Sequence, residues 1–273
     1  MTHWLQWQLF WRSFFLQTGW NFAKYQNLGL AFVMTPFLKT VYKQKKDLPS
    51  VLERYLEGFN TQPMMASFCF GALARQEERM AQAKTLAEYR ERLSEWNSLK
   101  RSLSITTASL GDRLFWGTLK PFTLLLALFI WLALNINFFE PVPQQTLAPM
   151  EMFGACIVAF LAFNAVALFV KWKGISLGYD APNNGCFGLT QFDWNKTIYN
   201  TKLFGMLLAM GLLLGGLYYF LHDLELFLGL KFITRAIIVL FFVSISLMTR
   251  DLRIPNMYLY MAAMLIFNIV YLF

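Results

Sequence analysis

Histidine, cysteine and charged residues are scarce in this chain of 273 residues. It has two histidines and three cysteines, and 15% of its residues are charged, against about 25% in an ordinary soluble domain. Cys69, Cys156 and Cys186 lie too far apart for a CxxC motif, and each stands in an apolar or glycine-rich stretch. We therefore expect no disulfide framework, no metal site and no cofactor.

Groups that could perform catalysis are equally few. His3 lies at the N-terminus and His222 in an expected outer loop, so neither has the orienting partner that a phosphohistidine or a Ser-His-Asp triad needs. Glu77 and Glu78 are neighbours, so on a helix they point about 100° apart and cannot face each other as an acid/base pair. No glycine-rich phosphate loop is present. These absences disfavour an enzyme, including a membrane-embedded transferase.

Apolar residues, in contrast, are abundant. They make up 57% of the chain and include 28 Phe, 13 Met, 11 Tyr and 9 Trp, and the mean hydropathy is +0.42. One soluble core of this size could not hide so much apolar surface from water. The net charge of +8 would suggest nucleic-acid binding in a soluble protein, but the apolar runs favour a membrane. We predict an all-α, polytopic integral membrane protein with no nucleic-acid partner.

The charges divide the chain into two regions at Pro121. Residues 1–120 hold 16 Lys and Arg against 9 Asp and Glu, whereas residues 121–273 hold 8 against 7. We predict that the first region is basic, amphipathic, and cytoplasmic or interfacial. The second region is predicted to be a transmembrane helix bundle.

Five apolar stretches predict about five membrane spans in the second region. A helix of about 19 residues rises about 28 Å, close to the hydrocarbon thickness of a bilayer. Flanking lysines and arginines place the N-terminus inside, and no cleavable signal sequence is visible. The fourth stretch carries Arg235, and the count fails if this segment does not cross. The stretches are residues 121–139, 152–170, 203–221, 232–248 and 255–273.

Small residues in two of these stretches suggest close helix packing. Gly211 and Gly215 have the GxxxG spacing that lets helix backbones approach, although a glycine-rich composition gives the same spacing by chance. Ala155, Ala159 and Ala162 form a similar small-residue stripe in the second stretch.

The first region begins with an aromatic amphipathic pattern. Trp4, Trp7, Trp11, Phe14 and Phe15 recur at three-to-four-residue spacing, with polar residues between them. This predicts a helix whose aromatic face suits the headgroup boundary of a membrane. Packing against protein is the alternative.

Three further segments complete the first region. Residues 75–101 carry both signs of charge and predict a solvated helix, most of it an arm without chemistry of its own. Residues 63–74 and 103–119 are apolar but too short to span comfortably. Each fits a short re-entrant hairpin or a buried core helix, and irregular backbone at membrane depth is where transport sites are built.

Polar side chains beside these short stretches are the candidates for ligand binding. Asn60, Thr61 and Gln62 directly precede a proline, and their amide and hydroxyl groups suit a neutral polyol such as a sugar. An ordinary cap or turn is an equal alternative. Asp112 is the second candidate, because a carboxylate beside an apolar segment is costly without a role. A salt bridge or helix cap with Arg113 is its alternative.

Four blocks of sequence occur in a recognisable order. They are RSFFLQTGWNFAKYQNLGLAFVMTPFLKTVY at 12–42, RYLEGFNTQP at 54–63, GALARQEE at 71–78 and LGDRLFWGTLKP at 110–121. Together these blocks resemble the IID membrane component of the mannose/fructose/sorbose-type sugar phosphotransferase systems. A weaker match continues at Lys173, Gly174 and Gly178-Tyr179.

The resemblance implies a membrane subunit that pairs with a IIC subunit to form a sugar permease. In such systems IIC and IID bind a hexose outside and move it inward, while separate IIA and IIB proteins relay phosphate from phosphoenolpyruvate. It also implies the bacterial inner (plasma) membrane, a higher oligomer of IIC–IID pairs, and no catalytic centre or phosphorylated residue in IID. The blocks carry substrate-binding or gating roles onto Asn60, Thr61, Gln62, Glu77, Glu78, Gly111 and Asp112.

The chain also departs from the family pattern. Gln62 stands where the family usually has histidine, residues 104–112 replace a Gly- and Pro-rich approach to the Gly-Asp pair, and Ala23-Lys24 replaces a charged pair. Fewer glycines predict a stiffer hairpin around Asp112. The alternative function is therefore a non-transporting regulatory or scaffold membrane protein of the same ancestry.

Overall fold

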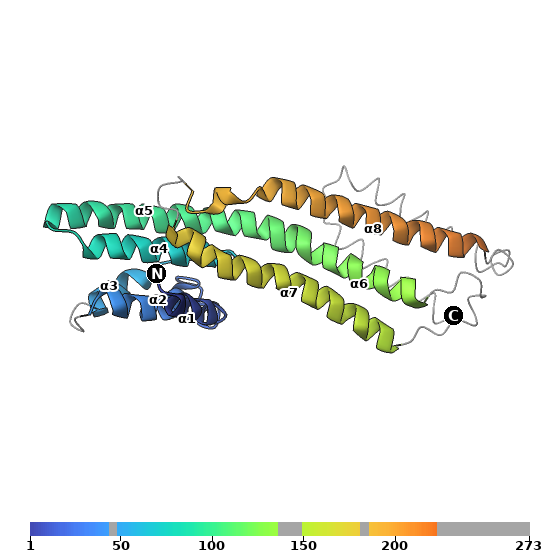
Figure 1. The fold of residues 1–273 in the computed structure, drawn as a ribbon, viewed down its shortest axis with the longest axis horizontal. Helices are drawn as coiled ribbons and strands as arrows, with labels where there is room; N and C mark the ends of the chain where they lie inside the picture. The colour runs from blue at the N-terminus through green and yellow to red at the C-terminus, as the bar shows by residue number, and fades with distance from the viewer. Residues whose placement is uncertain (44–47, 136–148, 181–185, 223–273) are drawn as a thin grey trace. The chain divides into compact units, whose positions relative to one another are not determined.

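The structure is a computed structural model that describes residues 1–43, 48–135, 149–180 and 186–222 (Figure 1). Within these ranges the chain is helical and contains no strand, which agrees with the all-α prediction. The elements are α1 His3–Ser13, α2 Asn27–Val41, α3 Leu48–Tyr55, α4 Ala66–Ala81, α5 Leu86–Gly111, a π-helical segment Asp112–Leu119, α6 Lys120–Asn135, α7 Pro149–Asp180, a 3-10 turn Leu189–Gln191 and α8 Trp194–His222.

Three of the described helices are long and apolar enough to cross a membrane. They are Leu86–Leu134, Met152–Asp180 and Trp194–Gly215. The predicted stretch 152–170 lies inside one of them, and most of 121–139 and 203–221 lies in the other two. The predicted spans 232–248 and 255–273 lie outside the described residues.

Residues 103–119, for which a re-entrant hairpin was one expectation, lie within the first of these helices. They form no hairpin, because α5, the π-helical segment and α6 run on as one helix (Figure 1). Gly111 keeps right-handed helical angles, with φ −66° and ψ −40°. The π-helical segment ends two residues before Pro121, which has no N–H to donate, and a shift to i→i+5 bonding accommodates that gap. The Lys120 N–H accordingly bonds the Phe115 carbonyl.

The expected charged helix over 75–101 is also corrected, because it is two helices. α4 ends at Ala81 and α5 begins at Leu86. Thr85 caps α5 by accepting a bond from the Glu88 N–H at 3.2 Å, and the Glu88 carboxylate accepts one from the Lys84 N–H at 2.8 Å. The Thr-x-x-Glu order is the capping-box signature, so the sequence itself indicates that a new helix begins here.

The first of the two short apolar stretches, residues 63–74, contributes to a buried core helix and not to a re-entrant hairpin. Residues 66–74, the first half of α4, are all buried. α4 contacts α1, α2, α5 and α7, and its contact with α7 is the most extensive one between helices in the described chain. α4 is therefore the centre of the fold.

Glycines bring α4 and α7 into backbone contact. A Cβ added to Gly71 would lie 2.1 Å from the Ile175 carbonyl oxygen, and one added to Gly178 would lie 2.3 Å from the Phe68 carbonyl oxygen. A Cβ on Gly174 would lie 2.2 Å from Ser67 Oγ. No side chain fits at these three positions, so the glycines set how closely the two helices approach.

The small residues predicted from the sequence restrict helix approach less than these three glycines do. A Cβ on Gly211 would lie 3.5 Å from the Phe129 ring, an ordinary contact, and one on Gly215 would meet no described residue within 4 Å. On α7, Ala155 and Ala159 are buried and Ala162 is half-buried, as expected for a packing stripe.

Replacing Gly178 with leucine tests the α4–α7 contact. We expect Gly178→Leu to lower the thermal unfolding midpoint in detergent by about 5–10 °C, because overpacking costs about 1–3 kcal/mol and 1 kcal/mol shifts a chain of this size by about 2–4 °C. Gly154→Leu on the same helix is the control, since a Cβ there lies within 4 Å of no residue that the structure describes. Equal midpoints for the two variants would contradict the proposed packing constraint.

Candidate functional site

Thr61 is buried in a network of internal hydrogen bonds. Its backbone exchanges two bonds with the Gln26 side chain: Gln26 Nε2 donates to the Thr61 carbonyl at 2.8 Å, and the Thr61 N–H donates to Gln26 Oε1 at 3.0 Å. The Thr61 hydroxyl lies 2.7 Å from Thr107 Oγ1. Because Thr107 itself donates to the Leu103 carbonyl at 2.7 Å, Thr61 is the donor of that pair. Thr61 thus fixes the loop before α4 to α2 and α5.

Gln62 is also buried, and it holds the start of α4. Its Oε1 accepts bonds from the N–H groups of Met64 at 2.7 Å and Met65 at 3.1 Å, which fixes the turn that leads into α4. Gly111 packs against it, and an added Cβ there would lie 2.6 Å from Gln62 Cβ. The structure therefore brings Thr61, Gln62 and Gly111 together.

Asn60 and Asp112 lie on either side of this contact with exposed side chains. Asn60 comes two residues before Gln62, and Asp112 directly follows Gly111. Within the described ranges neither side chain makes a hydrogen bond or ion pair, so the Asp112–Arg113 salt bridge that was the alternative is not formed there. Their amide and carboxylate groups are free to meet a ligand.

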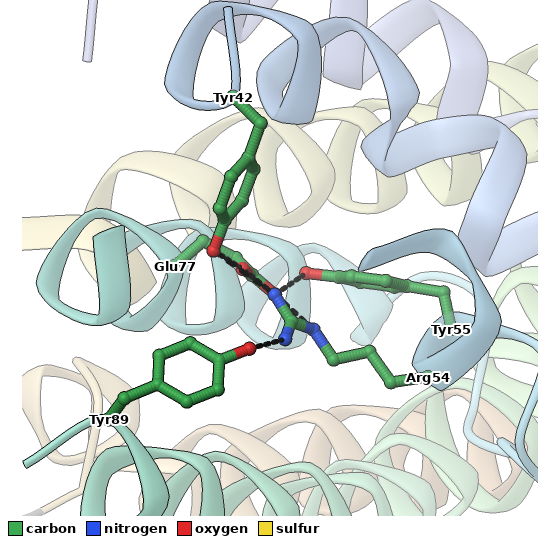
Figure 2. Close-up of polar contacts among 5 residues, drawn as sticks. All are labelled: Tyr42, Arg54, Tyr55, Glu77 and Tyr89. Carbon is green, nitrogen blue, oxygen red and sulfur yellow. Dashed lines mark hydrogen bonds and ion pairs between the residues drawn. The ribbon is translucent and has the colours of Figure 1, made fainter. Parts of the chain in front are cut away.

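Glu77 lies elsewhere, at the centre of a buried polar cluster that we call the Glu77 cluster: Tyr42, Arg54, Tyr55, Glu77 and Tyr89 (Figure 2). Its carboxylate is fully buried, forms an ion pair with Arg54 Nη2, and accepts a bond from Arg54 Nε at 3.2 Å. The hydroxyls of Tyr42 and Tyr55 donate to it at 2.9 and 2.7 Å. Arg54 Nη1 donates to the Tyr89 hydroxyl at 3.1 Å. Several donors on both oxygens replace the water that Glu77 loses on burial.

The two tyrosines that face Glu77 are held in their protonated form. Burial, and then the negative charge of Glu77, raise the pKa of Tyr55 well above its ordinary value and raise that of Tyr42 as well. A protonated hydroxyl can donate to the carboxylate, so both tyrosines act as donors over the physiological pH range.

Four segments converge on the Glu77 cluster. Tyr42 directly follows α2, Arg54 and Tyr55 come from α3, Glu77 from α4 and Tyr89 from α5. The prediction singled out Glu77 alone. A signal for its partners was available, because Tyr42 ends the first sequence block, Arg54 and Tyr55 open the second, and Glu77 lies in the third.

Glu78 belongs to a separate contact. Its carboxylate pairs with Arg75 at 3.2 Å and accepts a bond from the Tyr179 hydroxyl of α7 at 2.6 Å. The side chains of Glu77 and Glu78 therefore lie in different clusters, as their neighbouring helix positions require. Neither is joined by a hydrogen bond or ion pair to residues 60–62 among the described residues, and no three His, Cys, Asp or Glu side chains gather there as a metal ion would require.

A charge-removal series tests the Glu77 cluster. We expect Glu77→Gln to destabilise the protein by about 3 kcal/mol or more, because Arg54 keeps a buried charge without a partner. Adding Arg54→Met should recover part of the loss, since no unpaired cation remains. The measurement is thermal unfolding of the four variants of the cycle in detergent. Glu78→Gln is the control and should cost less than about 1 kcal/mol, because its pair is partly exposed. Additive losses in the cycle would argue against the pairing.

Comparison with known proteins gives a consistent family match. Residues 2–219 match the family described as PTS system mannose/fructose/sorbose family IID component. The sorbose-specific EIID component of Lacticaseibacillus casei is 34% identical over 165 residues, which cover 60% of this chain and 51% of that protein. The mannose-specific EIID component of Escherichia coli (strain K12) is 29% identical over 172 residues, or 63% of this chain and 53% of that protein. The chain thus spans about half the length of the curated relatives it matches.

Solved structures show a similar fold. A chain in the cryoEM structure of the mannose transporter ManYZ with microcin E492 matches with a TM-score of 0.54 at 25% identity, over 78% of this chain and 70% of that one. A chain described as a membrane protein matches with a TM-score of 0.58 at the same identity and coverage. These matches confirm the resemblance predicted from the four sequence blocks. The chain belongs to the mannose/fructose/sorbose family of IID membrane components of the sugar phosphotransferase system.

Proposed function

We propose that this chain is the IID subunit of a sugar permease in the bacterial inner membrane. It translocates a hexose together with a IIC subunit, and separate IIA and IIB proteins phosphorylate the sugar. The observation that carries the proposal is the family match over residues 2–219. The similarity to a chain of the ManYZ mannose transporter supports a membrane partner. In this proposal the chain crosses the membrane several times, and IIC–IID pairs assemble into a higher oligomer.

The proposed sugar contacts are Asn60 and Asp112. A hexose presents hydroxyl groups, which an amide can both donate to and accept from, and which a carboxylate can accept from. Both side chains are exposed and uncommitted within the described residues. A IIC subunit bound over this face would complete the pathway and exclude water from it.

The other predicted site residues take supporting roles in this proposal. Thr61 and Gln62 fix the loop that carries Asn60, and Gly111 lets the helix that carries Asp112 come close to that loop. Glu77 and Glu78 fix α4, to which the loop leads. The chain needs no catalytic residue, because in this proposal the phosphoryl group comes from separate proteins.

One observation favours the alternative, a non-transporting scaffold or regulatory protein. Thr61 and Gln62 use their side chains for internal hydrogen bonds, so two of the three polar groups in the Asn-Thr-Gln segment are not directed to a ligand. A scaffold would keep the fold and the partner but would not need Asn60 or Asp112.

Sugar uptake tests the two functions. We expect cells that express this chain with a cognate IIC subunit and the soluble phosphotransfer proteins to accumulate radiolabelled hexose. Asp112→Ala should reduce uptake about tenfold or more, since a hydrogen bond to a charged group contributes about 1.5–3 kcal/mol. Asn60→Ala should reduce it about fivefold, since a hydrogen bond between neutral groups contributes about 0.5–1.5 kcal/mol. Asn97→Ala and Asp180→Ala are matched controls, because these residues are exposed on α5 and at the end of α7.

The outcomes separate the two functions. Uptake that needs both subunits and falls only in the Asn60 and Asp112 variants, with IIC assembly unchanged, supports transport through this site. A stable IIC complex without uptake of any hexose supports the scaffold. Uptake that is unchanged in both variants would place the sugar contacts elsewhere.

A further inference from the structure

An open groove runs between α1 and α2. Trp4, Trp7 and Trp11 line it from α1, Thr35 and Pro36 line it from α2, and its volume is about 680 Å³. The three tryptophans are 70%, 44% and 59% exposed. The groove therefore presents a large aromatic surface that the described residues leave open.

Two cationic side chains, Arg12 of α1 and Lys39 of α2, also line this groove. Among the described residues, no aspartate or glutamate lines the groove and neither cation forms an ion pair. Two positive charges on an aromatic groove without a carboxylate complement an anion that carries apolar chains.

The position of Arg12 follows from Pro36. Proline has no N–H, so the carbonyl of Phe32, four residues earlier in α2, lacks its helical donor. Arg12 Nη1 fills this place at 2.9 Å, and its guanidinium lies 4.4 Å from the Phe32 ring centroid. This bond uses one of the five N–H groups of the guanidinium. Arg12 is thereby fixed at the groove and makes no other hydrogen bond to the described residues.

The groove is a fixed part of the fold, because α1 is tied to α7. Gln6 Nε2 donates to the Trp172 carbonyl at 3.1 Å, and the Trp7 and Trp172 rings lie 5.0 Å apart. At the C-terminal end of α1, Lys171 Nζ donates to the Ser13 carbonyl at 3.3 Å. Its positive charge balances the partial negative charge of this helix end. These bonds leave the tryptophan face of α1 turned to the groove.

We propose that the groove between α1 and α2 binds an anionic phospholipid. The lipid phosphate binds the Arg12 guanidinium, whose planar N–H groups match phosphate oxygens. Its acyl chains lie along the tryptophans, which favour the level of the headgroups. Lys39, seven residues and about 10 Å along α2 from Phe32, adds attraction for the negative headgroup. The site is independent of whether the chain transports a sugar.

Native mass spectrometry of the full-length protein in detergent tests this site. We expect the wild type to retain dioleoyl-phosphatidylglycerol in preference to dioleoyl-phosphatidylcholine, because only the first carries a net negative charge. Lys39→Gln should reduce that preference about fivefold, and Arg12→Gln with Lys39→Gln more than tenfold, from the usual contribution of one basic residue near an anionic membrane. Lys173→Gln is the control, since Lys173 is an exposed lysine of α7 outside the groove.

The single variant Lys39→Gln keeps the result decisive. Lys39 makes no hydrogen bond to the described residues, so Lys39→Gln tests the charge even where Arg12→Gln disturbs α2. Equal retention of the two lipids by the wild type would overturn the proposal. Equal loss in Lys173→Gln and Lys39→Gln would overturn it as well, because the effect would then be that of net charge.

Discussion

The backbone contact between α4 and α7 is the constraint on which the rest of this structure depends. Gly71, Gly174 and Gly178 remove the side chains that would keep the two helices apart. With α7 on one side and α1, α2 and α5 also in contact, residues 66–74 of α4 are all buried. A helix enclosed in this way can carry polar groups only where other parts of the chain satisfy them.

The polar groups accordingly gather toward the two ends of α4. Before its start, the Gln62 amide accepts bonds from the N–H groups of Met64 and Met65 and so fixes the turn that leads into the helix. Toward its end, the Glu77 carboxylate receives bonds from Arg54, Tyr42 and Tyr55, so that one buried charge joins α2, α3 and α4. Lys100 of α5 extends this end by donating to the carbonyls of Arg54 and Glu57 at 3.1 and 3.3 Å. The same enclosure thus explains both the bonded turn before α4 and its ion pair.

The sequence predicted the features that depend on local pattern. Hydropathy located the apolar helices, and aromatic spacing located α1, because each signal repeats within one helix. The break at residues 82–85 was missed although its capping box is local, since the charges on both sides suggested a single helix. The partners of Glu77 were missed for a different reason: Tyr42 and Arg54 lie 35 and 23 residues away, and no periodicity reports a contact across that separation.

The same distinction divides the candidate site residues. Thr61, Gln62, Gly111 and Glu77 are buried with their polar groups satisfied or their space filled, so the energetics of folding are enough to explain them. Folding does not explain Asn60 or Asp112, which are exposed beside a well-packed contact and make no side-chain bond to the described residues. A rigid support with free polar groups at its edge is the arrangement that ligand recognition requires, because the ligand then meets donors and acceptors already in place. Function is therefore best sought in the side chains that the fold itself does not use.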